Sequence, residues 1–180
     1  MLVQWRDDGF RYGLVTRILH WSTALLLLWQ FTGMAVKLIV GKAPITAFWV
    51  GTHKSIGVVL MVLIVARALW GLYNMKVRPA HGAGFWAMAA KAGHLVLYIL
   101  MLVVPALALL RQLGSGKPMD FFSLPLIPGG GAETVWLTAP ADAAHGLLAW
   151  VLLAAIAGHI AMVLIHRFIW KDETVRRMMG

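Results

Sequence analysis

The chain has 180 residues, of which 61% are hydrophobic and 13% are charged, and its mean hydropathy is +0.78. Soluble globular domains contain about half apolar and a quarter charged residues, so this composition indicates an integral membrane protein. The chain has no cysteine, which excludes disulfides, thiolate metal sites, iron–sulfur clusters and covalent CxxCH haem attachment. We attribute the net charge of +9 to membrane topology and not to nucleic-acid binding.

Four apolar segments are each long enough to span a bilayer. They run, in chain order, from Ile18 to Val40, from Gly51 to Tyr73, from Ala92 to Leu113 and from Ala141 to Ile169. A long linker rich in Gly and Pro, Gly114 to Pro140, precedes the last segment. Because no repeat or separate soluble domain is visible, we expect residues 1–180 to form a single all-α domain, a four-helix transmembrane bundle.

The distribution of basic residues predicts the orientation of the bundle. Cytoplasmic loops carry an excess of Lys and Arg. With a cytoplasmic N-terminus, eleven of these residues fall on the cytoplasmic side and five on the other. The eleven are Arg6, Arg11, Arg17, Arg67, Lys76, Arg78, Lys91, Arg167, Lys171, Arg176 and Arg177, and the five are Lys37, Lys42, Lys54, Arg111 and Lys117. We therefore expect both termini to be cytoplasmic.

Two histidines stand fourteen residues apart in the fourth apolar segment, His145 and His159. Fourteen residues of α-helix advance the chain by about 21 Å and return it to within roughly 40° of the starting direction. The two side chains therefore share one helix face at two depths of a bilayer whose apolar core is about 30 Å thick. This spacing is typical of a membrane protein that holds two haems, one above the other.

Two further histidines provide partners at these depths. His20 stands at the start of the first segment, near the cytoplasmic face, and His53 stands at the start of the second, near the opposite face. Matching by depth pairs His53 with His145 and His20 with His159. Each pair offers two axial nitrogens to one haem iron, and ionisable residues inside membrane segments are functional candidates by default.

The segments RYGLVTRILHW and HKSIG, together with the fourth-segment H-x13-H, resemble the bacterial cytochrome b561 family, over nearly the whole chain from Arg11 to about Arg167. That family is related to the cytochrome b subunits of hydrogenases and formate dehydrogenases. The resemblance implies a multi-pass protein of the bacterial inner membrane that binds two non-covalent b haems and exchanges electrons with quinone. It also implies His20, His53, His145 and His159 as the axial ligands. Some members oxidise superoxide outside the cytoplasm and reduce ubiquinone.

The remaining polar residues of the segments have several interpretations. His166 is a candidate quinone contact or an interfacial histidine beside Arg167. His94 is an alternative ligand, a second polar group of a quinone pocket or a packing residue. Arg67 is a candidate partner of the inner haem's propionates or a side chain that snorkels to the interface, and Lys54 is a candidate partner of the outer haem's propionates. Outer cations, Lys42, Lys54, Arg111 and Lys117, are candidates for steering an anion such as superoxide, and His81 is expected in a solvated loop.

These observations favour a di-haem oxidoreductase that takes electrons from superoxide and reduces ubiquinone. The alternative is a non-catalytic haem anchor and electron conduit for a partner dehydrogenase or a c-type cytochrome, with the Gly114 to Pro140 linker as its docking segment. A transporter with histidines in a proton path is a third class. Two observations distinguish these three functions: a purified transporter is colourless, and a conduit has no activity without its partner.

Overall fold

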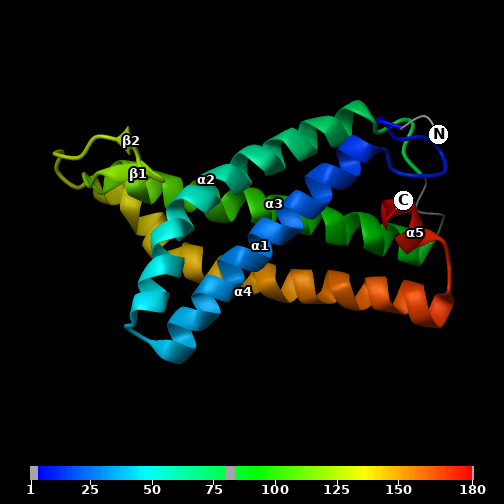
Figure 1. The fold of residues 1–180 in the computed structure, drawn as a ribbon. Helices are drawn as coiled ribbons and strands as arrows, with labels where there is room; N and C mark the ends of the chain where they lie inside the picture. The colour runs from blue at the N-terminus through cyan, green and yellow to red at the C-terminus, as the bar shows by residue number, and fades with distance from the viewer. Residues whose placement is uncertain (1–3, 80–83, 180) are drawn as a thin grey trace.

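Four long helices make up most of the protein. The computed structural model describes residues 4–79 and 84–179. The helices are α1 (Leu14–Val40), α2 (Pro44–Tyr73), α3 (Phe85–Gly114) and α4 (Val135–Leu164), and α4 continues into a π-helical turn, η1 (Ile165–Trp170). Each is long and apolar enough to cross a membrane, and α1 packs mainly against α2 while α3 packs mainly against α4. The expected four-helix membrane fold is confirmed, with both ends of the chain at one end of the bundle (Figure 1).

Each helix begins earlier than the apolar segment predicted from the sequence. The observed first residues are Leu14, Pro44, Phe85 and Val135 in place of Ile18, Gly51, Ala92 and Ala141. A 30-residue helix is about 45 Å long, so α2, α3 and α4 cross the headgroup regions as well as the hydrocarbon core. Proline suits the first turn of α2, because the N–H that it lacks has no partner there. His53 therefore lies about 14 Å inside α2 and not at its start, which corrects the expected position.

The buried core of the bundle lies midway along the helices. It consists of Leu60 and Ile64 on α2, Leu100 and Met101 on α3, and Leu152 on α4. Leu152 stands seven residues from each of the two histidines of α4, and hence about 10 Å from either along the helix axis. The core therefore separates the bundle into an upper and a lower level of polar side chains.

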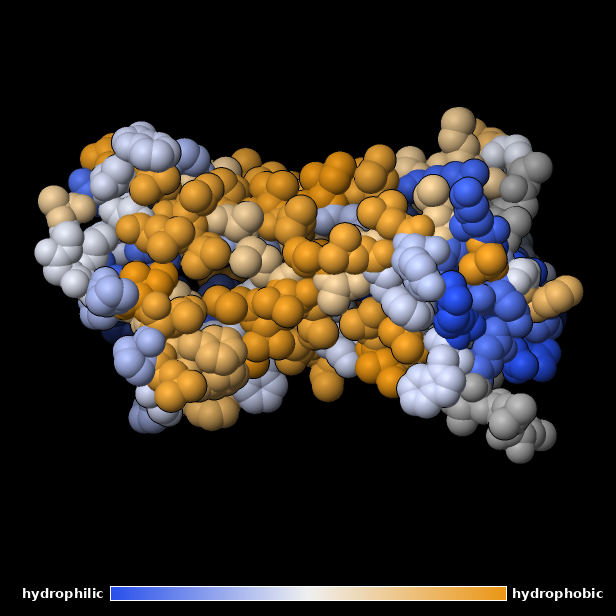
Figure 2. Space-filling model, turned by 90° about the horizontal axis from the view of Figure 1, so that it is seen from above, coloured by the Kyte–Doolittle hydropathy of each residue, from blue (hydrophilic) through white to orange (hydrophobic). Residues whose placement is uncertain are grey.

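The outer surface of the helices is apolar. Large hydrophobic side chains such as Leu28, Val62, Leu102 and Leu147 are exposed. Figure 2 shows a broad apolar band across the middle of the face in view, with the most hydrophilic residues gathered at the end that carries both termini. Such a band is what a bilayer requires of a surface that faces lipid. We call the end with the termini the termini end and the opposite end the outer end; that the termini end is cytoplasmic stays a prediction from the charge count.

A small β-hairpin covers the outer end. Its strands, β1 (Met119–Phe121) and β2 (Leu124–Ile127), pair antiparallel within the linker between α3 and α4, where the sequence predicted no regular structure. The Phe122 backbone N–H donates a 2.8 Å hydrogen bond to the Ser55 hydroxyl on α2. Met119 is buried beneath the hairpin. The hairpin is thus attached to α2 two residues from His53.

A buried carboxylate fastens the N-terminal segment at the termini end. Asp7, whose side chain is fully buried, accepts hydrogen bonds from the Gly13 backbone N–H (2.9 Å), the Thr16 hydroxyl (2.6 Å) and Arg78 Nε (2.9 Å). Trp70 Nε1 donates to the same Thr16 hydroxyl at 2.9 Å. These bonds join the segment before α1, the first turn of α1 and the connection that follows α2.

Candidate functional site: histidines at two levels

The upper level, which lies toward the outer end, contains His53 on α2 and His145 on α4. Their ring centres lie 6.3 Å apart, with the ring planes at 83°. His145 Nδ1 lies 3.0 Å from the Val104 carbonyl oxygen on α3, a contact in which the ring nitrogen is the donor. A neutral imidazole that donates through Nδ1 has its lone pair on Nε2, the nitrogen left to bind a metal. We call these two residues the outer pair.

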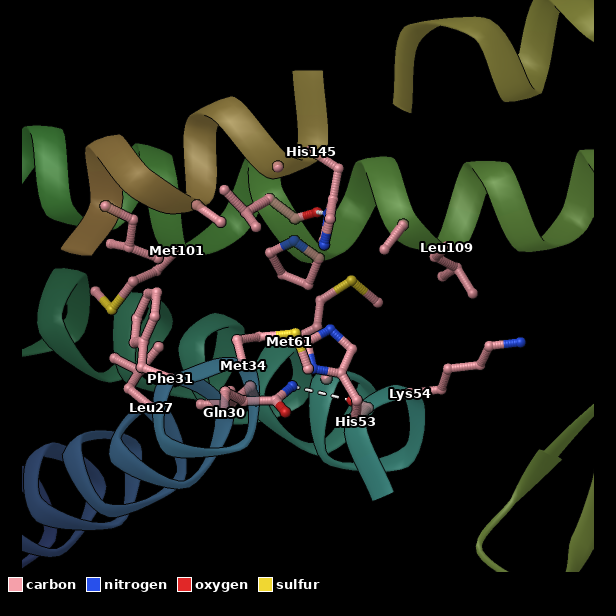
Figure 3. A pocket seen from close by; sticks show the side chains of 18 of the residues that line it. Leu27, Gln30, Phe31, Met34, His53, Lys54, Met61, Met101, Leu109 and His145 are labelled. Carbon is pink, nitrogen blue, oxygen red and sulfur yellow. Dashed lines mark hydrogen bonds between the residues drawn. The ribbon is translucent and has the colours of Figure 1, made fainter. Parts of the chain in front are cut away.

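The outer pair faces a cavity of about 560 Å³ that is lined by residues of all four helices. Figure 3 shows the two imidazoles extending from opposite walls, with apolar side chains such as Phe31, Met61 and Met101 around them. Gln30 Nε2 donates to the His53 backbone carbonyl at 2.9 Å, while His53 Nδ1 is buried without a hydrogen-bond partner. A mostly apolar cavity with a few convergent polar groups is the usual form of a cofactor site.

The dimensions of this cavity fit a haem. Two imidazoles bound to opposite faces of one iron, with metal–nitrogen bonds of about 2 Å, place their ring centres about 6 Å apart. The outer pair has this separation. Gly57 and Gly146 line the cavity, and a Cβ atom built at Gly146 would meet nothing within 4 Å. The two glycines leave room for a planar group beside the histidines.

The lower level contains three histidines, which we call the inner cluster. His20 on α1 and His159 on α4 have ring centres 6.4 Å apart, and His94 on α3 lies 5.4 Å from His159. The separation of His20 from His159 also suits two axial ligands of one iron. His94 Nδ1 lies 2.7 Å from the Ala90 carbonyl oxygen one turn earlier on its helix. The structure thus brings His94, for which the sequence left three interpretations open, into contact with His159.

Arg67 contacts the inner cluster directly. Its Nη2 lies 2.9 Å from His20 Nδ1, and its guanidinium lies 5.2 Å from the centre of the Tyr98 ring. Because a guanidinium only donates hydrogen bonds, His20 Nδ1 is the acceptor here. A neutral imidazole that binds metal through Nε2 instead keeps its proton on Nδ1. Ligation through Nε2 therefore requires Arg67 to leave His20, which frees the guanidinium for an anionic partner.

His166 lies beyond the inner cluster, within η1. Its Nδ1 lies 2.6 Å from Asp172 Oδ2, and its ring packs edge-on against the Trp170 ring at 4.6 Å. Burial by itself raises the pKa of Asp172. Hydrogen bonds from the Thr174 backbone N–H and from His166 outweigh this effect and hold that pKa below its usual value. The carboxylate is therefore charged at neutral pH. This contact could not be predicted from the sequence, because it depends on how the chain turns after η1.

Three of the four outer cations, Lys54, Arg111 and Lys117, line a second, polar cavity of about 290 Å³, together with Glu133. Lys42 does not line it. Lys54 Nζ donates to Gln112 Oε1 at 2.8 Å, and Arg111 forms an ion pair with Asp142. Lys54, Arg111 and Gln112 line the large cavity as well, so the polar cavity adjoins the site of the outer pair. His81, the remaining histidine, lies outside the residues that the structure describes.

Comparison with known proteins matches residues 11–180 to the family model described as prokaryotic cytochrome b561. Cytochrome b561 homolog 2 of Escherichia coli (strain K12) is 33% identical over 94% of this chain and 92% of its own length. Cytochrome b561 homolog 1 of the same organism is 28% identical over 89% and 92% of the two chains. A Yersinia pestis protein named "Probable superoxide oxidase CybB" is 27% identical over 89% and 91%. The chain therefore belongs to the prokaryotic cytochrome b561 family, whose members carry electrons in membranes through haem b.

Proposed function

We propose that the protein oxidises superoxide at the outer end and reduces ubiquinone at the termini end, through two b haems held one above the other. The outer haem would be bound by His53 and His145, and the inner haem by His20 and His159. The observation that carries the proposal is the pair of ring separations, 6.3 and 6.4 Å, on helices that face one another at two levels. Haem b supplies one-electron oxidation and reduction at each level.

The net reaction takes one electron from each of two superoxide ions and delivers both to one quinone. Two superoxide ions, one quinone and two protons give two molecules of oxygen and one quinol. Superoxide is a small anion, and the polar cavity lined by Lys54, Arg111 and Lys117 provides positive charge beside the outer site. The relative named as a superoxide oxidase supports this choice of substrate.

The chain's own residues hold the cofactors and separate the two sites. Arg67, once released from His20, would pair with the propionates of the inner haem, and Lys54 with those of the outer haem. The apolar core around Leu60 and Leu152 keeps water and ions from passing between the levels. His166, at the edge of the membrane span, would contact the quinone and provide a proton to it.

Rapid mixing of the oxidised, haem-loaded protein with superoxide tests the proposal. We expect the haem absorption to change to that of the reduced form, and added short-chain ubiquinone to restore the oxidised spectrum while quinol accumulates. Dithionite serves as the control reductant, because it shows that the haems of the preparation can be reduced. Haems that dithionite reduces and superoxide leaves oxidised would exclude superoxide as the donor.

A conduit for a partner protein remains the second candidate, because the hairpin offers a surface for it. Phe122, Leu124 and Leu126 are exposed there, at the outer end and close to the outer pair. Exposed apolar patches rimmed by polar residues commonly mark interaction sites. A partner that co-purifies in equal amount, together with an isolated chain that superoxide does not reduce, would favour this function over the first.

A further inference from the structure

The fold-back of the chain after η1 is arranged around His166. The backbone N–H groups of Lys171 and Asp172 both donate to the His166 carbonyl oxygen. The backbone of Lys171 is in the left-handed region (φ 51°, ψ 37°), which residues other than Gly, Asn and Asp seldom adopt. This turn reverses the chain and places the Asp172 carboxylate 2.6 Å from His166 Nδ1. The turn therefore holds His166 in two ways. Its backbone N–H groups bind the His166 carbonyl oxygen, and the Asp172 side chain binds the imidazole ring.

The two carboxylate oxygens of Asp172 have separate tasks. Oδ1 accepts the Thr174 backbone N–H at 2.9 Å, which caps the short helix α5 (Thr174–Met179), while Oδ2 accepts from His166. The cap fixes the carboxylate, and the carboxylate fixes the imidazole. Because Nδ1 is occupied, the ring can exchange a proton with a substrate only through Nε2.

From this geometry we infer that Asp172 is a positioning residue for quinone protonation, which accepts the hydrogen bond of His166 Nδ1 and thereby holds the ring with Nε2 toward the substrate. The inference rests on the proposed quinone reduction at the termini end. One quinone takes up two electrons and two protons to become quinol. The imidazolium gives its Nε2 proton to a quinone oxygen, and the neutral ring regains a proton from water on the termini side.

Among the described residues, Asp172 is the carboxylate that contacts His166. Other charged groups on the neighbouring elements are Arg167 on η1, Lys171, Lys91 on α3, and Arg177 on α5. Glu173 and Arg176 pair with one another at 3.1 Å, and His94 on α3 is a further titratable group. Trp170 and Trp86, whose rings lie 5.5 Å apart, connect η1 to the start of α3. The Trp170 ring, whose centre lies 4.6 Å from that of His166, provides a flat apolar surface beside the imidazole, which suits a quinone ring.

The test compares Asp172→Asn with Glu173→Gln in the full, haem-loaded chain. Asparagine keeps the oxygen that caps α5, and it replaces the negatively charged oxygen that accepts from His166 Nδ1 by an amide NH2 group, which cannot accept that hydrogen bond. Glu173→Gln removes the same charge one residue away and is the matched control. The measured quantity is the rate at which short-chain ubiquinone reoxidises the chemically reduced haems, recorded between about pH 5 and pH 8.

We expect Asp172→Asn to lower kcat about tenfold to a hundredfold with little change in KM, because the imidazole is no longer held toward the substrate. Glu173→Gln should keep the wild-type rate and profile. In a chain that carries His166→Gln, adding Asp172→Asn should have no further effect, because the residue acts through the histidine. The haem spectrum and haem content should be the same in every variant.

A wild-type rate and pH profile in Asp172→Asn would overturn the inference, as would an equal loss in Glu173→Gln or a change in haem content. Additive losses in the double variant would overturn it too. If quinone does not reoxidise the reduced wild-type protein at all, the proposed quinone reduction fails and the inference fails with it. If it does and the Asp172 variant matches wild type, only the inference fails.

Discussion

Replacing His145 by alanine should remove the outer haem and leave the inner haem in place. The change deletes one axial nitrogen of the outer pair, whereas His159 on the same helix lies about 21 Å away along its axis. In the haem-free protein the substitution loses the hydrogen bond to the Val104 carbonyl, which is worth about 1 kcal/mol. We therefore expect the fold to survive and the haem content to fall from two per chain to one.

Haem content per protein and the reduced-minus-oxidised absorption spectrum measure this effect. His53→Ala should give the same single-haem spectrum as His145→Ala, because the two residues belong to one site. His20→Ala and His159→Ala should give the other spectrum. The reasoning is refuted if a correctly folded His145→Ala chain loses both haems or keeps both, or if His53→Ala and His145→Ala retain different haems.

Three further substitutions test the surroundings of the two levels. Arg67→Met should weaken retention of the inner haem about tenfold or more, since a charge-assisted hydrogen bond is worth about 1.5–3 kcal/mol; the rate of haem transfer to an acceptor protein measures it. Asp7→Ala should lower the free energy of unfolding by about 3 kcal/mol, because it leaves Arg78 without its carboxylate, and thermal unfolding in detergent checks this. Gly146→Leu should block the outer haem by filling the cavity without lowering the stability of the haem-free chain, whereas Gly51→Leu, also in open space, should leave haem content unchanged.

The membrane fold could be predicted because a bilayer restricts the possible structures so strongly. A spanning segment must satisfy its backbone hydrogen bonds internally, so four long apolar segments become four helices. The helical rise then converts residue numbers into depths. This is why the sequence predicts His53 at the depth of His145 and His20 at the depth of His159, and in the structure the ring centres of these residues lie 6.3 and 6.4 Å apart. Their role as pairs of haem ligands stays a prediction.

Depth along the helix axis does not determine which side chains meet across the bundle. The contact of His94 with His159 depends on the rotation and tilt of α3 relative to α4, and that of Arg67 with His20 on the packing of α2 against α1. The hairpin over the outer end was missed because its strands are only three and four residues long. Asp172 was missed since it reaches His166 only after the chain reverses.

The predicted starts of the helices differ from the observed starts for a different reason. Hydropathy detects the part of a helix that lies in the hydrocarbon core, whereas the helices continue into the headgroup regions. Pro44 lies between the first two apolar segments of the sequence, and in the structure it is the first residue of α2. Polar residues within the apolar segments, such as Gln30 and Gln112, were an available signal of the site, because polar groups at that depth need partners.

The two levels differ in the charge that lies beside them, and this difference gives the proposed electron route a direction. Arg67 is partly buried inside the bundle beside the inner cluster, whereas Lys54 is exposed at the outer end. A positive charge stabilises an added electron more strongly in a low-dielectric interior than at a solvated surface. If each level holds a haem as proposed, reduction would therefore be favoured at the inner cluster relative to the outer pair. An electron accepted at the outer end would then move to lower free energy as it passes toward the termini end.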